Sequence, residues 1–134
     1  MSIEAAIFQQ TISDSVIAAA LASDGGVKVY PGAAPQETKP PLIVFQRIST
    51  NPEYNQDMAV DIVVARVQVE AWAKEHDAAL ALAEKFNRVW SGFRGSIYGF
   101  NIHGVFLEDE RPIFNDDLEI WAVQSDYFFS YTEA

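Results

Sequence analysis

The residues able to support catalysis or metal binding are few in this sequence. It contains two histidines, His76 and His103, and no cysteine. Neither histidine has a glutamate or a second histidine at ligand spacing, so a zinc site or a nucleophilic triad has few candidate parts. We therefore expect ordinary surface or edge roles for both histidines. The sequence predicts no catalytic residue, no metal site and no cofactor.

A group of carboxylates between residues 108 and 119 is the other candidate for metal chemistry. It lacks the Asp-x-Asp-x-Asp-Gly spacing of a calcium loop, and Pro112 and Phe114 interrupt it. We interpret this stretch as a solvated connection between two strands. Its members are Glu108, Asp109, Glu110, Asp116, Asp117 and Glu119.

Composition limits the classes of protein to consider. The chain has 134 residues, with 9 Lys and Arg against 19 Asp and Glu and a net charge of −10. Its length predicts a single domain over residues 1–134. The basic residues are scattered singly, which argues against a grip on nucleic acid. No apolar stretch approaches the ~20 residues that span a bilayer. We expect a soluble, intracellular, acidic domain with no membrane partner.

The first half of the chain is predicted to begin with a helix over residues 3–22, because this segment is rich in Ala, Ile and Gln and lacks Gly and Pro. Helical spacing predicts an inner face of Phe8, Ile12, Val16 and Ala19, with Ile3 and Ile7 beside it. The glycines at 25 and 26 end this helix. Further segments follow in order: a strand at 27–30, an irregular connection at 31–41, a strand at 42–48 and a polar loop at 50–58.

The clearest local pattern is the strand at 60–73. Val63, Ala65, Val67, Val69, Ala71 and Ala73 alternate with Val64, Arg66, Gln68, Glu70 and Trp72. This period of two predicts a half-buried antiparallel strand. The period then changes to that of a helix over 75–90, whose apolar stripe faces the core and whose end is capped by Gly92.

Two strands are predicted to finish the chain, at 100–110 and 118–131, joined by the acidic connection 111–117. In the first, Ile102, Gly104 and Phe106 are expected on one side and His103, Val105 and Leu107 on the other. Together the segments predict an α+β fold with two layers. Its sheet would be mainly antiparallel with four to five strands, and two major helices would pack on one face.

Aromatic residues concentrate between Phe86 and Tyr131. The last strand places Trp121, Val123, Tyr127, Phe129 and Tyr131 on one face and Ile120, Ala122 and Phe128 on the other. Two interpretations stay open. The aromatic residues form a bulky core under a single layer of helices, or a neighbouring subunit covers a second apolar face.

Several blocks of sequence, read in order, carry a family resemblance. The first comprises Val29-Tyr30-Pro31 and the later segment 40–45. The second is 65–73, followed by the Ala-rich helix at 78–90. The third comprises 107–111 and 124–131. In this order and spacing the chain resembles the tail-completion, or tail-terminator, proteins of long-tailed bacteriophages.

The resemblance implies a structural, non-enzymatic virion protein. Such proteins form a homo-hexameric ring that caps the finished tail tube, stops its polymerisation and offers a joining surface to the head. The implied partners are further copies of the chain, the tail tube protein and the head connector. DNA would only pass through the lumen, where carboxylates would repel its phosphates. The implied location is the tail end nearest the head, reached from the host cytoplasm during assembly.

A closed ring requires two different contact surfaces on each subunit, and the polar loops 31–41, 50–58 and 111–117 would touch the tube and connector rings. We predict that Arg47 and Arg66 donate salt bridges to an acidic neighbour. The full set of expected partner contacts is Arg47, Asn51, Tyr54, Asn55 and Arg66.

Two other functions stay open. One is an α+β enzyme or small-ligand-binding domain that uses Glu70 or Asp126 as a buried acid. The other is a host-encoded adaptor that forms a different oligomer. Turnover as a monomer or dimer would favour the enzyme, whereas assembly of several subunits would favour the ring.

Overall fold

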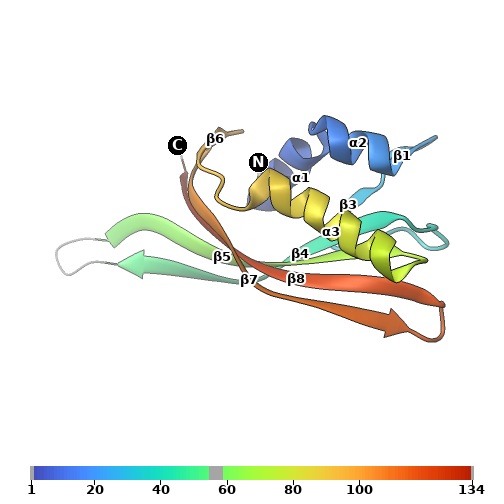
Figure 1. Cartoon of the computed structure of the whole chain (residues 1–134). Coiled ribbons are helices and arrows are strands. Elements are labelled where there is room, and N and C mark those ends of the chain that lie inside the picture. Colours follow the sequence, from blue (N-terminus) through green and yellow to red (C-terminus); the bar gives the residue numbers. More distant parts are fainter. Residues whose placement is uncertain (1, 55–58, 134) are drawn as a thin grey trace.

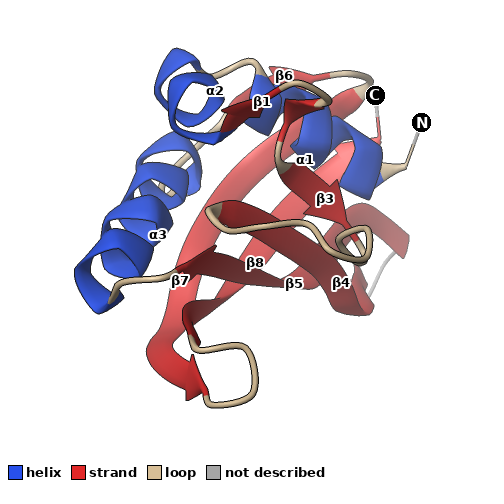
Figure 2. Ribbon diagram, turned by 90° about the vertical axis from the view of Figure 1, so that its right-hand side faces the viewer, coloured by secondary structure: helices blue, strands red, loops and turns tan. Residues whose placement is uncertain are grey.

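The computed structural model describes residues 2–54 and 59–133, without the side chains of 52–61. Helices pack on one face of a twisted sheet, as Figures 1 and 2 show, so the predicted two-layer α+β architecture is confirmed. The elements are α1 (Ile3–Ile12), α2 (Ser15–Leu21), β1 (Ala22–Ser23), β2 (Gly26–Val27), β3 (Val29–Pro31), β4 (Leu42–Tyr54), β5 (Ala59–Ala73), α3 (His76–Trp90), β6 (Gly95–Ile97), β7 (Phe100–Asn115) and β8 (Ile120–Glu133).

The sheet differs from the predicted antiparallel sheet of four to five strands. Among the described residues it has six strands in the order β3-β4-β5-β8-β7-β6, and β1 pairs with β2 in a separate small sheet. The pair β3–β4 is parallel, so the sheet is mixed. The short strand β6 was not predicted. The four long strands β4, β5, β8 and β7 are antiparallel to their neighbours.

The prediction of a single helix over 3–22 is wrong, because the helix is interrupted at residues 13 and 14, between α1 and α2. The carboxylate of Asp14 accepts a 3.0 Å hydrogen bond from the amide of Ile17 and so caps the start of α2. The break changes the helical phase, so Val16 from the predicted inner face is 53% exposed. Ile3 and Ile7 are buried, as predicted, and Phe8 and Ile12 pack partly buried against the core. The other buried residues are Ala6 and Thr11 of α1 and Ile17 and Leu21 of α2.

The centre of the fold agrees with the sequence pattern. The alternating residues Ala65, Val67 and Val69 of β5 are buried beneath α3, and Arg66 lies on the opposite, helix-free face. Helix α3 is tied to its surroundings by two hydrogen bonds. The Trp90 indole donates to the Thr11 hydroxyl at 2.9 Å, and the Tyr127 hydroxyl donates to the Asn87 side chain at 3.0 Å.

Half of the clustered aromatic residues are buried in the core beneath the helices: Phe86, Trp90, Phe100, Tyr127, Phe129 and Tyr131. Their ring centroids lie 5.1 Å apart for Trp90 and Phe129 and 5.4 Å apart for Phe86 and Tyr127. The interpretation as a bulky core therefore accounts for this face. Phe106 and Phe128 lie on the helix-free face, outside that core.

Strands extend into two segments that were predicted to be loops. β4 continues to Tyr54 and β7 continues to Asn115. The β4–β5 hairpin projects well past the helices (Figure 1), so no helix covers its outer part. Without a helix to pack against, this part needs no alternating apolar residues, and the pattern of half-buried strands is missing from its sequence.

A bulge in β7 changes the predicted sides of this strand. The pairing with β8 shifts register between Ile102 and Gly104. Ile102 is therefore buried on the core side with Val105, while Gly104 and Phe106 face away from the helices. No helix among the described residues is both long and apolar enough to span a membrane.

Candidate functional site

An ion-pair network occupies the middle of the helix-free face. The carboxylate of Asp126 on β8 lies 3.2 Å from the guanidinium of Arg66 on β5 and 3.5 Å from that of Arg111 on β7. The side chain of Asp126 is only 4% exposed. One buried carboxylate thus links three neighbouring strands. Its two arginine partners offset the free-energy cost of burying its charge.

Further polar groups surround this carboxylate. Arg66 also contacts Glu108 at 3.6 Å, and Arg111 contacts Asp109 at 2.6 Å and donates to the Gln124 side chain at 3.0 Å. Counted together with Asp126, the network has three carboxylates and two guanidinium groups, so its net charge is negative.

Phe106 forms an exposed apolar spot beside the network. It pairs with Phe128 across β7 and β8, and the Arg66 guanidinium lies 5.7 Å from the Phe128 ring centre. A Cβ atom on Gly104 would lie 3.1 Å from the Phe106 ring, so this ring rests over the glycine. Even so, Phe106 is 64% exposed, the highest value among the large apolar residues that stand out at the surface.

Arg47, the second predicted salt-bridge donor, lies on the other face of the sheet. Its guanidinium is 3.3 Å from the carboxylate of Glu4 at the start of α1. Burial raises the pKa of the nearby Tyr131, and Arg47 partly offsets this rise. The structure therefore does not bring Arg47 and Arg66 together, and both make ion pairs within their own chain.

The remaining predicted contact residues belong to the β4–β5 hairpin. Asn51 is an exposed residue of β4 opposite Val64. Tyr54 is the last residue of β4, and its side chain lies outside the described residues, as does all of Asn55. Asn51 and Tyr54 thus both belong to the last part of β4.

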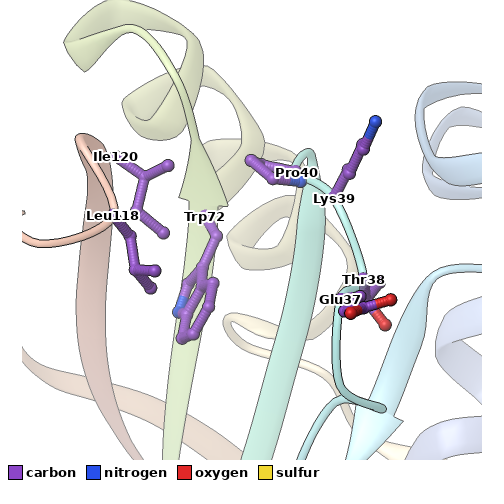
Figure 3. A pocket seen from close by; sticks show the side chains of 7 residues that line it. All are labelled: Glu37, Thr38, Lys39, Pro40, Trp72, Leu118 and Ile120. Carbon is purple, nitrogen blue, oxygen red and sulfur yellow. The ribbon is translucent and has the colours of Figure 1, made fainter.

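A groove of about 440 Å³ lies over Trp72, which sequence reasoning missed (Figure 3). One wall is the segment Glu37–Pro40, and the other is formed by Leu118 and Ile120 beside the β7–β8 turn. The Trp72 indole donates to the Glu70 carboxylate at 3.1 Å. The groove joins segments far apart in sequence, so no local pattern could have predicted it.

An enzyme or ligand-binding domain would need one of the two candidate acids, Glu70 or Asp126, to line a pocket such as this groove. Glu70 lines an adjoining hollow of the same region together with Trp72 and Leu118. Asp126, the other acid considered, is instead enclosed by Arg66 and Arg111. The described residues contain no group of three or more His, Asp or Glu side chains placed to hold a metal ion.

The sequence matches the family described as "Tail completion protein gp17" over residues 5–127. The chain belongs to this tail completion family. The resemblance found in the sequence is thereby confirmed. Membership supports a structural tail protein rather than an enzyme. A search of curated proteins found no match.

Among solved structures, the tail completion chain is similar to one from a structure titled "Virion of native gene transfer agent (GTA) particle". The two share 15% sequence identity with a TM-score of 0.79, and the match covers 98% of this chain and 95% of the other. At this identity the similarity establishes a shared fold over nearly the whole length of both chains.

The sheet of this tail completion protein ends in two long edges that are only partly covered. β3 pairs with β4 at residues 43–45, and β6 pairs with β7 at residues 100–102. Beyond these contacts, no other strand in the described part of the chain pairs with the β4 edge (Gln46–Asn51) or the β7 edge (Gly104–Asn115). Exposed apolar residues gather there: Ile48, Phe106, Ile113 and Phe114.

Proposed function

We propose that this chain is a ring-forming tail terminator. Six copies close a ring on the end of the tail tube, stop the tube protein from polymerising and present the surface that joins the tail to the head connector. Membership of the tail completion family supports this function. The mechanism is geometric and requires no catalytic group.

The observation that carries the proposal is the pair of unlike open edges. A rotational ring needs a head-to-tail contact, in which one surface of a subunit meets a different surface of the next. The β4 edge and the β7 edge lie on opposite sides of the sheet and differ in sequence. They supply the two surfaces that such a contact requires.

The helix-free face is suited to line the lumen. It lacks helices that would narrow the passage, and the network around Asp126 has more carboxylates than guanidinium groups. With a net charge of −10 on each chain, a ring repels the phosphates of passing DNA. DNA then moves through the ring without binding to it.

The five predicted contact residues have different positions in this arrangement. Arg47 and Asn51 lie on the β4 edge and face a neighbouring copy. Tyr54 ends β4, and it would contact the tube or connector ring together with Asn55, which lies outside the described residues. Arg66 lies on the lumen face and acts there mainly on its own chain through Asp126.

Polymerisation of the cognate tail tube protein in the presence of the purified chain tests this function. Tube lengths are measured by electron microscopy at increasing ratios of chain to tube protein. We expect the mean length to fall as the ratio rises, because each capped end stops growing. Equal length distributions with and without the chain would refute the terminator function.

A further inference from the structure

The two open edges lie at the same height in the sheet. Following the pairing from strand to strand, Arg47 on β4 is level with Val67, then Tyr127, then Leu107 on β7. By the same registers Thr50 is level with Val105. The stretch Gln46–Asn51 on one side therefore lies opposite Gly104–Asp109 on the other.

Both edges present backbone hydrogen-bonding groups outwards. The Phe45 carbonyl accepts from the Gly32 amide and the Val105 carbonyl accepts from the Gly92 amide, so both carbonyls point away from the neighbouring long strand. Backbone groups alternate in direction along a strand, and the extra residue at the register shifts between Arg47 and Ser49 and between Leu107 and Asp109 moves the alternation on by one residue. The groups of Thr50 on β4 and of Leu107 on β7 therefore also point outwards, towards the side on which another strand could pair. The Val105 carbonyl already accepts from Gly92, so the free outward positions of the β7 stretch begin at Leu107.

Proline marks the far end of the pairing stretch on β7. By the same alternation the nitrogen of Pro112 lies on the outward side of β7. The pairing of β7 with β8 therefore does not need an amide hydrogen at this position. A partner strand finds no amide donor at this position. The usable part of the β7 edge therefore lies before residue 112.

Strand direction determines how two such edges can meet. The four long strands alternate in direction, so β4 and β7 run antiparallel to each other within one chain. Rotation about an axis along the strands leaves their direction unchanged. When β7 of one copy meets β4 of the next, the two strands are antiparallel and the alternation continues through the contact.

Each of the two stretches carries one large exposed apolar residue, Ile48 at 50% and Phe106 at 64%. Pairing would bury these two side chains against the neighbour and remove them from water. The charged residues Arg47, Glu108 and Asp109 already have partners within their own chain, so the contact rests on backbone pairing and on these apolar side chains.

From these features we infer that neighbouring copies join by antiparallel pairing of Gln46–Asn51 of one chain with Gly104–Asp109 of the next, with Ile48 and Phe106 packed at the contact. The inference rests on the proposed ring and adds its subunit interface. The occupant of each edge is a second copy of this chain, and the sheet becomes continuous around the ring.

Thiol crosslinking tests this interface directly, because the chain has no cysteine of its own. Ile48→Cys and Phe106→Cys are combined in one chain, rings are assembled on tube ends, and a short bis-maleimide reagent is added. The two positions lie on opposite edges of one sheet, so a crosslink between them joins different chains. We expect a ladder of covalent multimers up to six chains on a denaturing gel.

Two matched variants make the result specific. Either cysteine alone should give no ladder, since a head-to-tail contact does not bring a position next to itself. The pair Ile48→Cys with Val16→Cys, which places the second thiol on exposed α2, should also give none. A ladder from the control pair as strong as that from the test pair would overturn the interface.

Ring mass separates the two possible failures. If rings of normal mass form but the test pair does not crosslink, the ring stands and the edge interface is refuted. If no multimer forms in solution or on the tube, the terminator function itself is refuted. Phe106→Glu should abolish ring formation while the circular dichroism spectrum is unchanged, and Val16→Glu should alter neither.

Discussion

The carboxylate of Asp126 lies 3.2 Å from the guanidinium of Arg66, in a position where its side chain is almost fully covered. From the sequence alone, Arg66 is expected to contact a neighbouring chain, and Asp126 is one of two candidates for a buried catalytic acid. The structure shows them as one ion pair between adjacent strands. Because this ion pair joins β5 and β8, we infer that both residues mainly stabilise the sheet.

Loss of this carboxylate should weaken the fold. Asp126→Asn removes the charge that Arg66 and Arg111 share at the centre of the helix-free face. Since both arginines are partly exposed, we expect the free energy of unfolding to fall by about 2 kcal/mol rather than by the full cost of a buried unpaired charge. Urea denaturation measures this change.

The exposed ion pair between Glu84 and Arg88 on α3 provides the control. Glu84→Gln should change the free energy of unfolding by no more than about 0.5 kcal/mol, because a solvated pair on a helix surface contributes little. If both substitutions had the same small effect, the network around Asp126 would not stabilise the sheet.

The contact between α1 and α3 should be similarly sensitive. Thr11→Val keeps the side-chain shape but leaves the buried Trp90 indole without its acceptor. We expect a loss of about 1–3 kcal/mol in thermal or urea unfolding, the usual cost of an unsatisfied buried polar group. Ser13→Ala, which removes an exposed hydroxyl bonded to Gln9, should have a much smaller effect.

Stability should also fall at high pH. Burial, with a smaller contribution from the charge of Glu110, raises the pKa of Tyr127 above its ordinary value of 10.0. Above pH 10 the unfolded chain releases a proton that the folded chain keeps. The free energy of unfolding should therefore be insensitive to this group below pH 10 and fall above it, by up to about 1.4 kcal/mol per pH unit.

Tyr127→Phe isolates this contribution. The variant lacks the hydrogen bond to Asn87 and is less stable at neutral pH, but its stability should decline less steeply above pH 10. An identical slope for Tyr127→Phe would contradict this account of its protonation.

The centre of the fold was predictable because burial imposes a period on the sequence. β5 has one face under α3 and one without helices, so Val67 and its alternate neighbours are apolar while Arg66 is not. The stripe of α3 has the same origin. Such patterns indicate which face of a strand or helix packs against the core. They therefore predicted the two layers and the core strands.

Other features depend on contacts that a local pattern does not contain. The break at Asp14 rests on a single capping hydrogen bond within an otherwise helical composition. The β4–β5 hairpin extends past the helices, so its outer residues have no covered face to report. A bulge at His103 reverses the side of Ile102 relative to Phe106, and no sequence period could indicate it.

The candidate surfaces were less predictable than the core. The family resemblance indicated a structural tail protein, and the family match confirms the resemblance. The sequence did not indicate which edges of the sheet remain open, because that depends on how short β3 and β6 are relative to their partners. The five contact residues Arg47, Asn51, Tyr54, Asn55 and Arg66 stay a prediction.

Electron cryo-microscopy of tail tubes grown with the purified chain would show directly whether the chain closes a ring on the tube. We expect a single closed ring of six chains at one end of each tube, with the helices outside and the helix-free face lining the lumen. Tubes whose ends carry no ring, or carry the chain as isolated monomers, would contradict it.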